Sequence, residues 1–255
     1  MPVANDNSPD AGLFYRLGQA AGRRLRRGRW VWRSLTGGEA DALRAERDVG
    51  RDLATAFRRQ FPLARRPETR RALDEIGARL AGRLRDRRRT FVFSLVAAEA
   101  PNAFALPGGF VFVTSGMLDL LGPDRDEAAF LLAHEMAHVV HKDAIERVKT
   151  ETAVSMALRA LPVGGGAMRW ARSAGARLLR SAYSRKREDA ADRFALRLAR
   201  AAGFDPRAGA ELLRRLAAAN GSGSGMLGEY FSTHPPLETR ARRLDELART
   251  GNRGR

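Results

Sequence analysis

The stretch FLLAHEMAHVVHKD (residues 130–143) contains three of the chain's four histidines. The apolar residues around them predict a helix that is buried in the protein. His134 and His138 are four positions apart, so their imidazoles lie on one face of this helix, one turn apart. Burying both rings and Glu135 without partners would cost several kcal/mol. The stretch therefore predicts a bound ligand; the alternative is a partly exposed helix where these residues occur together by chance.

The spacing is that of the H-E-x-x-H pattern, in which two histidines bind zinc and the glutamate is a general base. The chain has no cysteine, which excludes disulfides, thiolate metal sites and cysteine nucleophiles. A third ligand must therefore be His, Asp or Glu. We expect one Zn²⁺ per chain, held in part by His134 and His138, with Glu135 taking a proton from the attacking water.

A second segment, SRKREDAADRFAL (184–196), offers the missing ligand. Glu188 and Asp192 are four residues apart and share a helix face, and neighbouring apolar residues mark the buried side. One carboxylate can bind zinc, while the other can accept a hydrogen bond from the far nitrogen of a ligand histidine. The alternative is a solvated, charged helix.

Apolar periodicity and turn residues predict an α+β fold that is mostly α, with a small sheet. The sequence divides into a basic, partly disordered extension (1–39), a main domain (40–250) and a short tail (251–255). A turn is expected at Pro107–Gly109 and a flexible loop at 220–225. Helices are expected at 40–61, 67–87, 124–141, 143–160, 168–202 with a break near 181–185, from Pro206 onward and at the C-terminal end, and paired strands at 90–98 and 110–114.

Four segments in order resemble the HtpX and CAAX-prenyl-protease type of zinc metallopeptidases, which are gluzincins. They are ERDVG (46–50), NAFALPGGFVFVTSGML (102–118), HEMAH followed by SRKREDAAD, and STHPPLETR (232–240). The resemblance implies a zincin-like metalloprotease domain whose small sheet borders the cleft. It also implies zinc ligands His134, His138 and Glu188, the base Glu135, and an Asp192 that holds a ligand histidine.

The resemblance implies further roles near the zinc. His234, in the His-Pro element, would either donate to the oxyanion during turnover or occupy the open zinc position and keep the enzyme latent. Arg240 matches the family's arginine after His-Pro and would direct its charge at the same cleft. His141 is assigned no role.

An edge strand would pair with an extended substrate. The residues expected to border the substrate are Asn102, Gly109, Phe110, Val111 and Phe112. Pairing of this kind favours unfolded, flexible or membrane-associated polypeptides. The resulting hypothesis is a zinc metalloendopeptidase that acts in protein quality control or processing.

The net charge of +17 supports a different hypothesis, a basic module that binds a membrane surface or nucleic acid. Residues 1–90 contain 22 arginines against 11 acidic residues, and residues 11–36 combine basic and aromatic side chains. An anionic membrane surface is thus an expected partner of residues 11–36. A nucleic-acid partner is not expected, because arginine is enriched throughout the chain. A metal-dependent chaperone without turnover is a further alternative, which the intact Glu135 disfavours.

No signal peptide is visible, and no segment reaches the roughly 18 apolar residues that a membrane span requires. We expect a cytoplasmic protein, peripheral to the inner face of the membrane.

Overall fold

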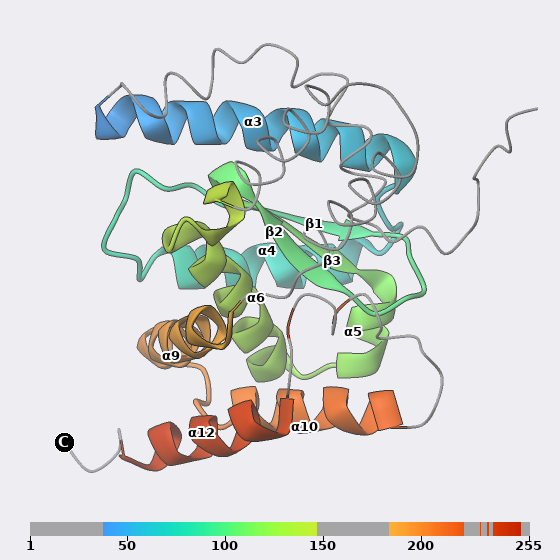
Figure 1. Cartoon of the computed structure of the whole chain (residues 1–255). Coiled ribbons are helices and arrows are strands. Elements are labelled where there is room, and N and C mark those ends of the chain that lie inside the picture. Colours follow the sequence, from blue (N-terminus) through green and yellow to red (C-terminus); the bar gives the residue numbers. More distant parts are fainter. Residues whose placement is uncertain (1–37, 147–183, 222–229, 231–233, 235–236, 251–255) are drawn as a thin grey trace, which may run out of the picture.

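The computed structural model describes residues 38–146, 184–221, 230, 234 and 237–250. A small sheet lies in the middle, with helix α3 over one face and the remaining helices against or beyond the other (Figure 1). The α+β prediction is confirmed.

The elements are α3 (Glu39–Gln60), α4 (Pro67–Ala81), β1 (Val92–Val96), β2 (Ala103–Leu106), the 3-10 turn η1 (Pro107–Gly109), β3 (Phe110–Thr114), α5 (Ser115–Leu121), α6 (Arg125–Val140), α9 (Arg185–Ala201), α10 (Ala208–Gly221) and α12 (Leu237–Thr250).

The sheet has the order β1-β3-β2, with β3 parallel to β1 and antiparallel to β2. The expected pairing of 90–98 with 110–114 is confirmed. The prediction that Gly109, Phe110, Val111 and Phe112 border an edge strand is wrong, because β3 is paired on both sides. Strand β2 has four residues, two of them alanine, so it gave too weak a pattern to be recognised. Asn102 precedes β2, and its backbone N–H donates to Thr114 Oγ1 at 2.9 Å.

Alternate side chains of β3 enter two different apolar clusters. Phe110 and Phe112 pack toward α3, whereas Val111 and Val113 belong to the larger core formed with α4 and α6. All five residues of the strand are buried, which explains its continuous apolar run. Phe57 of α3 closes the smaller cluster, with its ring centroid 4.7 Å from that of Phe112.

The turn between β2 and β3 is held by α3. Gly108 and Gly109 have φ angles of 72° and 88°, a backbone region that favours glycine. The carboxylate of Glu46 accepts a hydrogen bond from the Gly108 N–H at 3.1 Å. Glu46 also forms a buried ion pair with Arg89 at 3.2 Å. These contacts fix the end of the sheet to the first long helix.

Helix α6 runs through the interior, which explains why the opening stretch is apolar on nearly all sides. It begins where expected, since the Asp124 side chain accepts hydrogen bonds from the N–H groups of Asp126 and Glu127. The side chain of Glu127 does not complete a capping box. It binds Arg215 of α10 instead, at 2.9 Å.

Several predicted boundaries differ from the observed ones. The helix expected to reach residue 87 ends at Ala81, before Gly82, and the helix expected from Pro206 begins at Ala208. Gly203, just beyond the end of α9, has a left-handed backbone with φ 78°. Residues 11–36 and 147–183, which include most of two predicted helices, lie outside the described residues.

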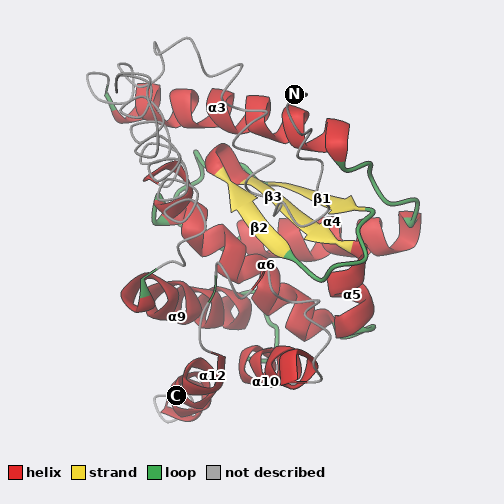
Figure 2. Ribbon diagram, turned by 45° about the vertical axis from the view of Figure 1, so that its right-hand side comes forward, coloured by secondary structure: helices red, strands yellow, loops and turns green. Residues whose placement is uncertain are grey.

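Helices α9, α10 and α12 complete the domain beyond α6. Figure 2 shows α10 and α12 side by side, with α9 next to α6. The contact between α6 and α9 brings two distant parts of the sequence together. Within the described ranges, no helix is long and apolar enough to cross a membrane.

We expect Phe57→Ala to lower the free energy of unfolding by about 3–5 kcal/mol, because it opens a cavity between α3 and the sheet. Urea denaturation measures this change. Arg44→Ala, at a side chain that is 79% exposed, is the control and should stay within about 0.5 kcal/mol of the wild type. A loss below about 1 kcal/mol for Phe57→Ala would show that α3 does not unfold together with the sheet.

Candidate metal centre

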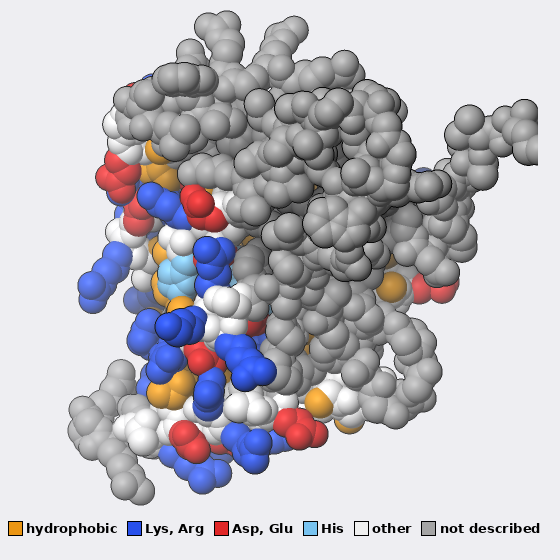
Figure 3. All heavy atoms as spheres, viewed as in Figure 1, with side chains coloured by type: hydrophobic (Ala, Val, Ile, Leu, Met, Phe, Trp, Pro, Cys, Tyr) orange, Lys and Arg blue, Asp and Glu red, His pale blue; other side chains and the backbone are white. Residues whose placement is uncertain are grey.

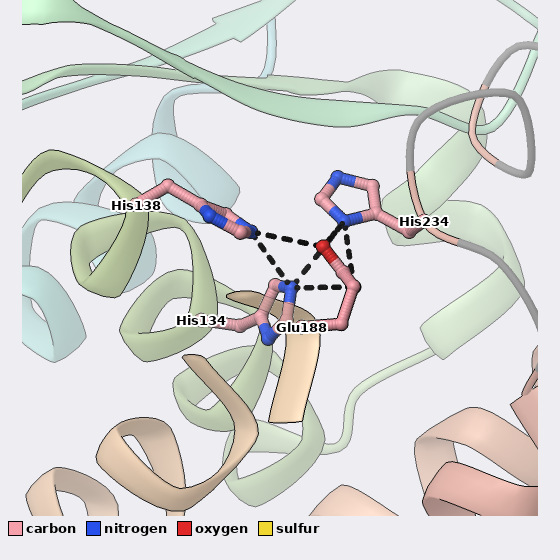
Figure 4. Close-up of side chains that lie close together, drawn as sticks. All are labelled: His134, His138, Glu188 and His234. Atoms are coloured by element: carbon pink, nitrogen blue, oxygen red, sulfur yellow. Dashed lines mark hydrogen bonds and ion pairs between the residues drawn. The ribbon is translucent and has the colours of Figure 1, made fainter. Parts of the chain in front are cut away.

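Four side chains from three parts of the chain converge on one point (Figure 4). His134 and His138 project from α6, Glu188 comes from the first turn of α9, and His234 precedes α12. One potential ligand atom from each lies within 4.8 Å of all the others. All four residues are buried, with at most 1% of their surface exposed. The structure thus brings together the three predicted zinc ligands and one further histidine.

The donor atoms are close to one another. The Nε2 atoms of His134 and His138 are 3.2 Å apart. Glu188 Oε1 lies 3.4 Å from His138 Nε2, and Glu188 Oε2 lies 3.5 Å from His134 Nε2. His234 Nδ1 is 3.1 Å from both oxygens of Glu188 and 3.4 Å from His134 Nε2.

The far nitrogens of the two α6 histidines both face carboxylates. His134 Nδ1 is 3.0 Å from Asp192 Oδ1, and His138 Nδ1 is 3.1 Å from Asp143 Oδ2. An ionised carboxylate only accepts hydrogen bonds, so each Nδ1 carries the hydrogen and a neutral ring turns the Nε2 lone pair toward the centre. If both rings are neutral, their lone pairs 3.2 Å apart repel each other, and a proton or a metal cation between the two Nε2 atoms removes that repulsion. This set of imidazole nitrogens and a carboxylate fits Zn²⁺.

The surrounding charges also favour a cation. Burial opposes protonation of His134, but Asp192 and Glu188 outweigh it and raise the pKa of this imidazole to about 9. Burial by itself would raise the pKa of the Glu188 carboxyl. The neighbouring His234, together with hydrogen bonds from the α6 histidines, instead holds that pKa far below its usual range. Glu188 is therefore ionised and ready to bind a metal.

Arg240 balances the two carboxylates of α9. Its Nε and Nη2 contact Asp192 at 2.8 and 2.7 Å, and its Nη1 lies 2.7 Å from Glu188 Oε2. The guanidinium is almost completely buried, and these anions keep its pKa raised although burial opposes its charge. Arg240 also holds the pKa of Asp192 far below the ordinary value, against the effect of burial. The charge of Arg240 is thus directed at the carboxylates behind the centre.

Glu135 lies next to the donor group and is 1% exposed. Its Oε1 is 3.6 Å from His234 Nε2, beyond hydrogen-bonding distance. Among the described residues this oxygen has no hydrogen-bond partner. Leaving a buried oxygen without a hydrogen bond costs about 1–3 kcal/mol. A carboxylate that must accept and release a proton needs such an available oxygen.

His234 is held by its own short segment. Its backbone N–H donates to the Tyr230 carbonyl at 2.9 Å, and the two rings are 4.8 Å apart. Burial lowers the pKa of the His234 imidazole, while Glu188 opposes that shift. Nδ1 of this ring lies within hydrogen-bonding distance of both Glu188 oxygens, so it donates a hydrogen bond here, and it becomes a candidate metal ligand in the tautomer that places the hydrogen on Nε2.

Three neighbours of the centre were not identified from the sequence. Asp143 and Arg187 contact each other at 3.4 Å beside His138, and Tyr230 packs on His234. Asp143 lies beyond the end of α6, so no helical spacing relates it to the histidine it contacts. His141, which had no predicted role, packs against Phe194, with ring centroids 5.4 Å apart.

Comparisons with known proteins agree with this geometry. A sequence profile described as Peptidase family M48 matches residues 67–248, which is more than half of the chain. The chain is 38% identical over 156 residues to the mitochondrial metalloendopeptidase OMA1 of Schizosaccharomyces pombe, covering 60% of this chain and 45% of the relative. It is 34% identical over 186 residues to a protease HtpX homolog of Salinibacter ruber, covering 60% of this chain and 67% of the relative.

A third relative is the putative beta-barrel assembly-enhancing protease of Vibrio cholerae, 32% identical over 172 residues, with 63% of this chain and 35% of the relative covered. The chain thus spans less than half the length of two of these three relatives. The resemblance predicted from the four sequence segments is confirmed. With HEMAH on a buried helix and a carboxylate supplied by the next described helix, this chain belongs to peptidase family M48.

Proposed function

We propose that this protein is a zinc-dependent metalloendopeptidase that hydrolyses peptide bonds. The observation that carries the proposal is the buried group of His134, His138 and Glu188 with Glu135 beside it. A basic binding module does not require these residues at one buried point. A metal-dependent chaperone without turnover does not require a buried glutamate oxygen with no partner among the described residues.

The chemistry divides between the metal and the chain. Bound zinc would supply a Lewis acid that polarises the scissile carbonyl and makes a water molecule acidic near neutral pH. Glu135 takes the proton from the attacking water and returns it to the leaving amine. Asp192 keeps the hydrogen of His134 on Nδ1, so that Nε2 stays available to the metal.

We assign His234 the role of a latch in this conformation. A catalytic zinc site has three protein ligands and one open position, whereas a site with four protein ligands is closed. His234 Nδ1 lies as close to the Glu188 oxygens and His134 as those ligands lie to one another. With a metal held by His134, His138 and Glu188, His234 would fill the position that a catalytic site leaves open to substrate. The other predicted role, donation to the oxyanion, would require a different position of the ring.

Arg240 acts as a positioning residue. Two carboxylates in a buried centre repel each other, and the guanidinium between them offsets that repulsion. It orients Glu188 for the metal and Asp192 for His134, without contacting the reacting atoms itself.

The substrate is an extended polypeptide segment. Strand β2 lies next to α6 and pairs with β3 on one side, while its other side pairs with no described strand. That side provides backbone groups to which an extended chain can add. This assignment replaces β3 as the substrate strand. It favours unfolded, flexible or membrane-associated proteins as substrates, consistent with a role in quality control or processing.

An anionic membrane surface remains a predicted partner. Residues 11–36, to which it was assigned, lie outside the described residues. The face that Figure 3 shows carries Lys and Arg side chains over α9. The exposed cations of this helix include Arg185, Lys186, Arg193 and Arg197, and such groups attract anionic lipids.

Glu135→Gln should keep the fold and the zinc but reduce casein cleavage by roughly 100- to 10,000-fold, because the base acts only in the chemical steps. The assay combines elemental analysis with mass spectrometry of the casein fragments. His134→Ala, His138→Ala and Glu188→Ala are the comparison set, and each should lose zinc. Undiminished cleavage by Glu135→Gln would exclude the mechanism.

His234→Ala should raise the rate of casein cleavage severalfold and weaken zinc binding, because it opens one position at the metal. His141→Ala is the matched control, since this histidine lies outside the donor group. A fall of roughly 100- to 1,000-fold would instead identify His234 as an oxyanion donor. Unchanged cleavage would assign it neither role.

Arg240→Met should reduce the free energy of unfolding by about 3–5 kcal/mol in the presence of a chelator, because two buried carboxylates lose their counterion. Arg243→Met tests the same change on the same helix. Its ion pair with Asp189 is half exposed and should contribute about 1 kcal/mol or less. Equal effects of the two substitutions in urea denaturation would contradict the assigned role of Arg240.

A further inference from the structure

The chain makes a sharp turn directly after α6. His141 ends the helix and Lys142 adopts a left-handed backbone, with φ 64°. This conformation costs a residue other than glycine about 1–2 kcal/mol. The turn brings the Asp143 side chain back against the helix, where Asp143 is 5% exposed and its Oδ2 lies 3.1 Å from His138 Nδ1. A cost of this kind persists where the surrounding structure requires the geometry.

The second oxygen of Asp143 faces the other ligand-bearing helix. Oδ1 lies 3.4 Å from Nε of Arg187, the residue directly before Glu188 in α9. Asp143 therefore connects a ligand histidine of α6 with the part of α9 that supplies the ligand carboxylate. The Arg187 side chain is 46% exposed, so its contact is weaker than a buried ion pair.

The arrangement matches the one on the opposite side of the centre. There Asp192 contacts His134 Nδ1 and is held by Arg240. Each ligand histidine of α6 thus has an aspartate at Nδ1 and an arginine behind that aspartate. The two pairs differ in burial, because Arg240 is 4% exposed whereas Arg187 is half exposed.

We propose that Asp143 is a positioning residue for the metal centre, which fixes the orientation and tautomer of His138 and is itself oriented by Arg187. The inference rests on the proposed zinc site. An aspartate at Nδ1 keeps the hydrogen on that atom and turns Nε2 toward the metal. Substituting such a partner typically weakens metal affinity by roughly 10- to 100-fold.

The test measures zinc binding by the full-length chain, in competition with a chromophoric chelator, and the absorption spectrum after cobalt substitution. Asp143→Ala should weaken zinc affinity by roughly 10- to 100-fold and shift the cobalt bands, because His138 is no longer oriented. Asp143→Asn should lose less affinity than Asp143→Ala, because its amide oxygen still accepts a hydrogen bond from Nδ1.

Two controls separate this role from general effects. Asp119→Ala removes an exposed aspartate that forms a surface ion pair with Arg66, 53 residues earlier in the chain. Its zinc affinity should stay within about twofold of the wild-type value, because surface ion pairs contribute little. Lys142→Gly relieves the left-handed strain while keeping Asp143, and should preserve affinity and raise stability.

The outcomes are distinguishable. If the wild type binds zinc and His138→Ala does not, but Asp143→Ala keeps both wild-type affinity and the wild-type cobalt spectrum, the inference is overturned and the proposed function stands. A wild-type chain that binds no zinc overturns the proposed function and this inference together. If Asp143→Ala does not fold, Asp143→Leu decides, because it fills a similar volume but cannot accept a hydrogen bond from Nδ1: wild-type affinity and spectrum in that variant would overturn the inference.

Discussion

The whole arrangement depends on one constraint, the burial of several polar groups around α6. The Nε2 atoms of two imidazoles lie 3.2 Å apart, with an ionised carboxylate beside them. Such a cluster is stable in a protein interior only when cations balance it. Arg240 supplies one positive charge from behind, and the donor set leaves room for a metal at the front. Helix α9 packs against α6 and helix α12 against α9, and this packing brings the charged groups together.

The sheet contributes through its order. Because β3 lies between β1 and β2, it is not available for pairing with a substrate, and its alternating phenylalanines and valines face two separate clusters on the two sides of the sheet. Strand β2 lies next to α6 and, among the described strands, pairs only with β3. The hydrogen bond from the Gly108 N–H to Glu46 ties α3 to the turn at which β2 ends and β3 begins.

Two aspartate–arginine pairs, which differ in burial, orient the α6 histidines. The pair of Asp192 and Arg240 is buried and joins three segments of the chain, so it is part of the core. The pair of Asp143 and Arg187 lies at the rim and depends on a strained backbone at Lys142. His234 lies across the front of the centre. The rear of the site is therefore held by buried contacts, whereas among the described residues His234 lies across its front.

The sequence by itself determined the helical pair of histidines, the neighbouring glutamate and the carboxylates four residues apart on α9, because these relations are local and follow from helical periodicity. It also predicted most helices, the paired strands and the glycine turn. Its interpretation failed at β2, which is too short and alanine-rich to show a period, and consequently at the edge of the sheet. Only the tertiary structure decided that Arg240 reaches both Glu188 and Asp192, that Asp143 returns to His138, and that His234 lies beside His134 and Glu188. These contacts join residues whose separation along the chain follows no periodic rule, and they form only when packing brings their elements together.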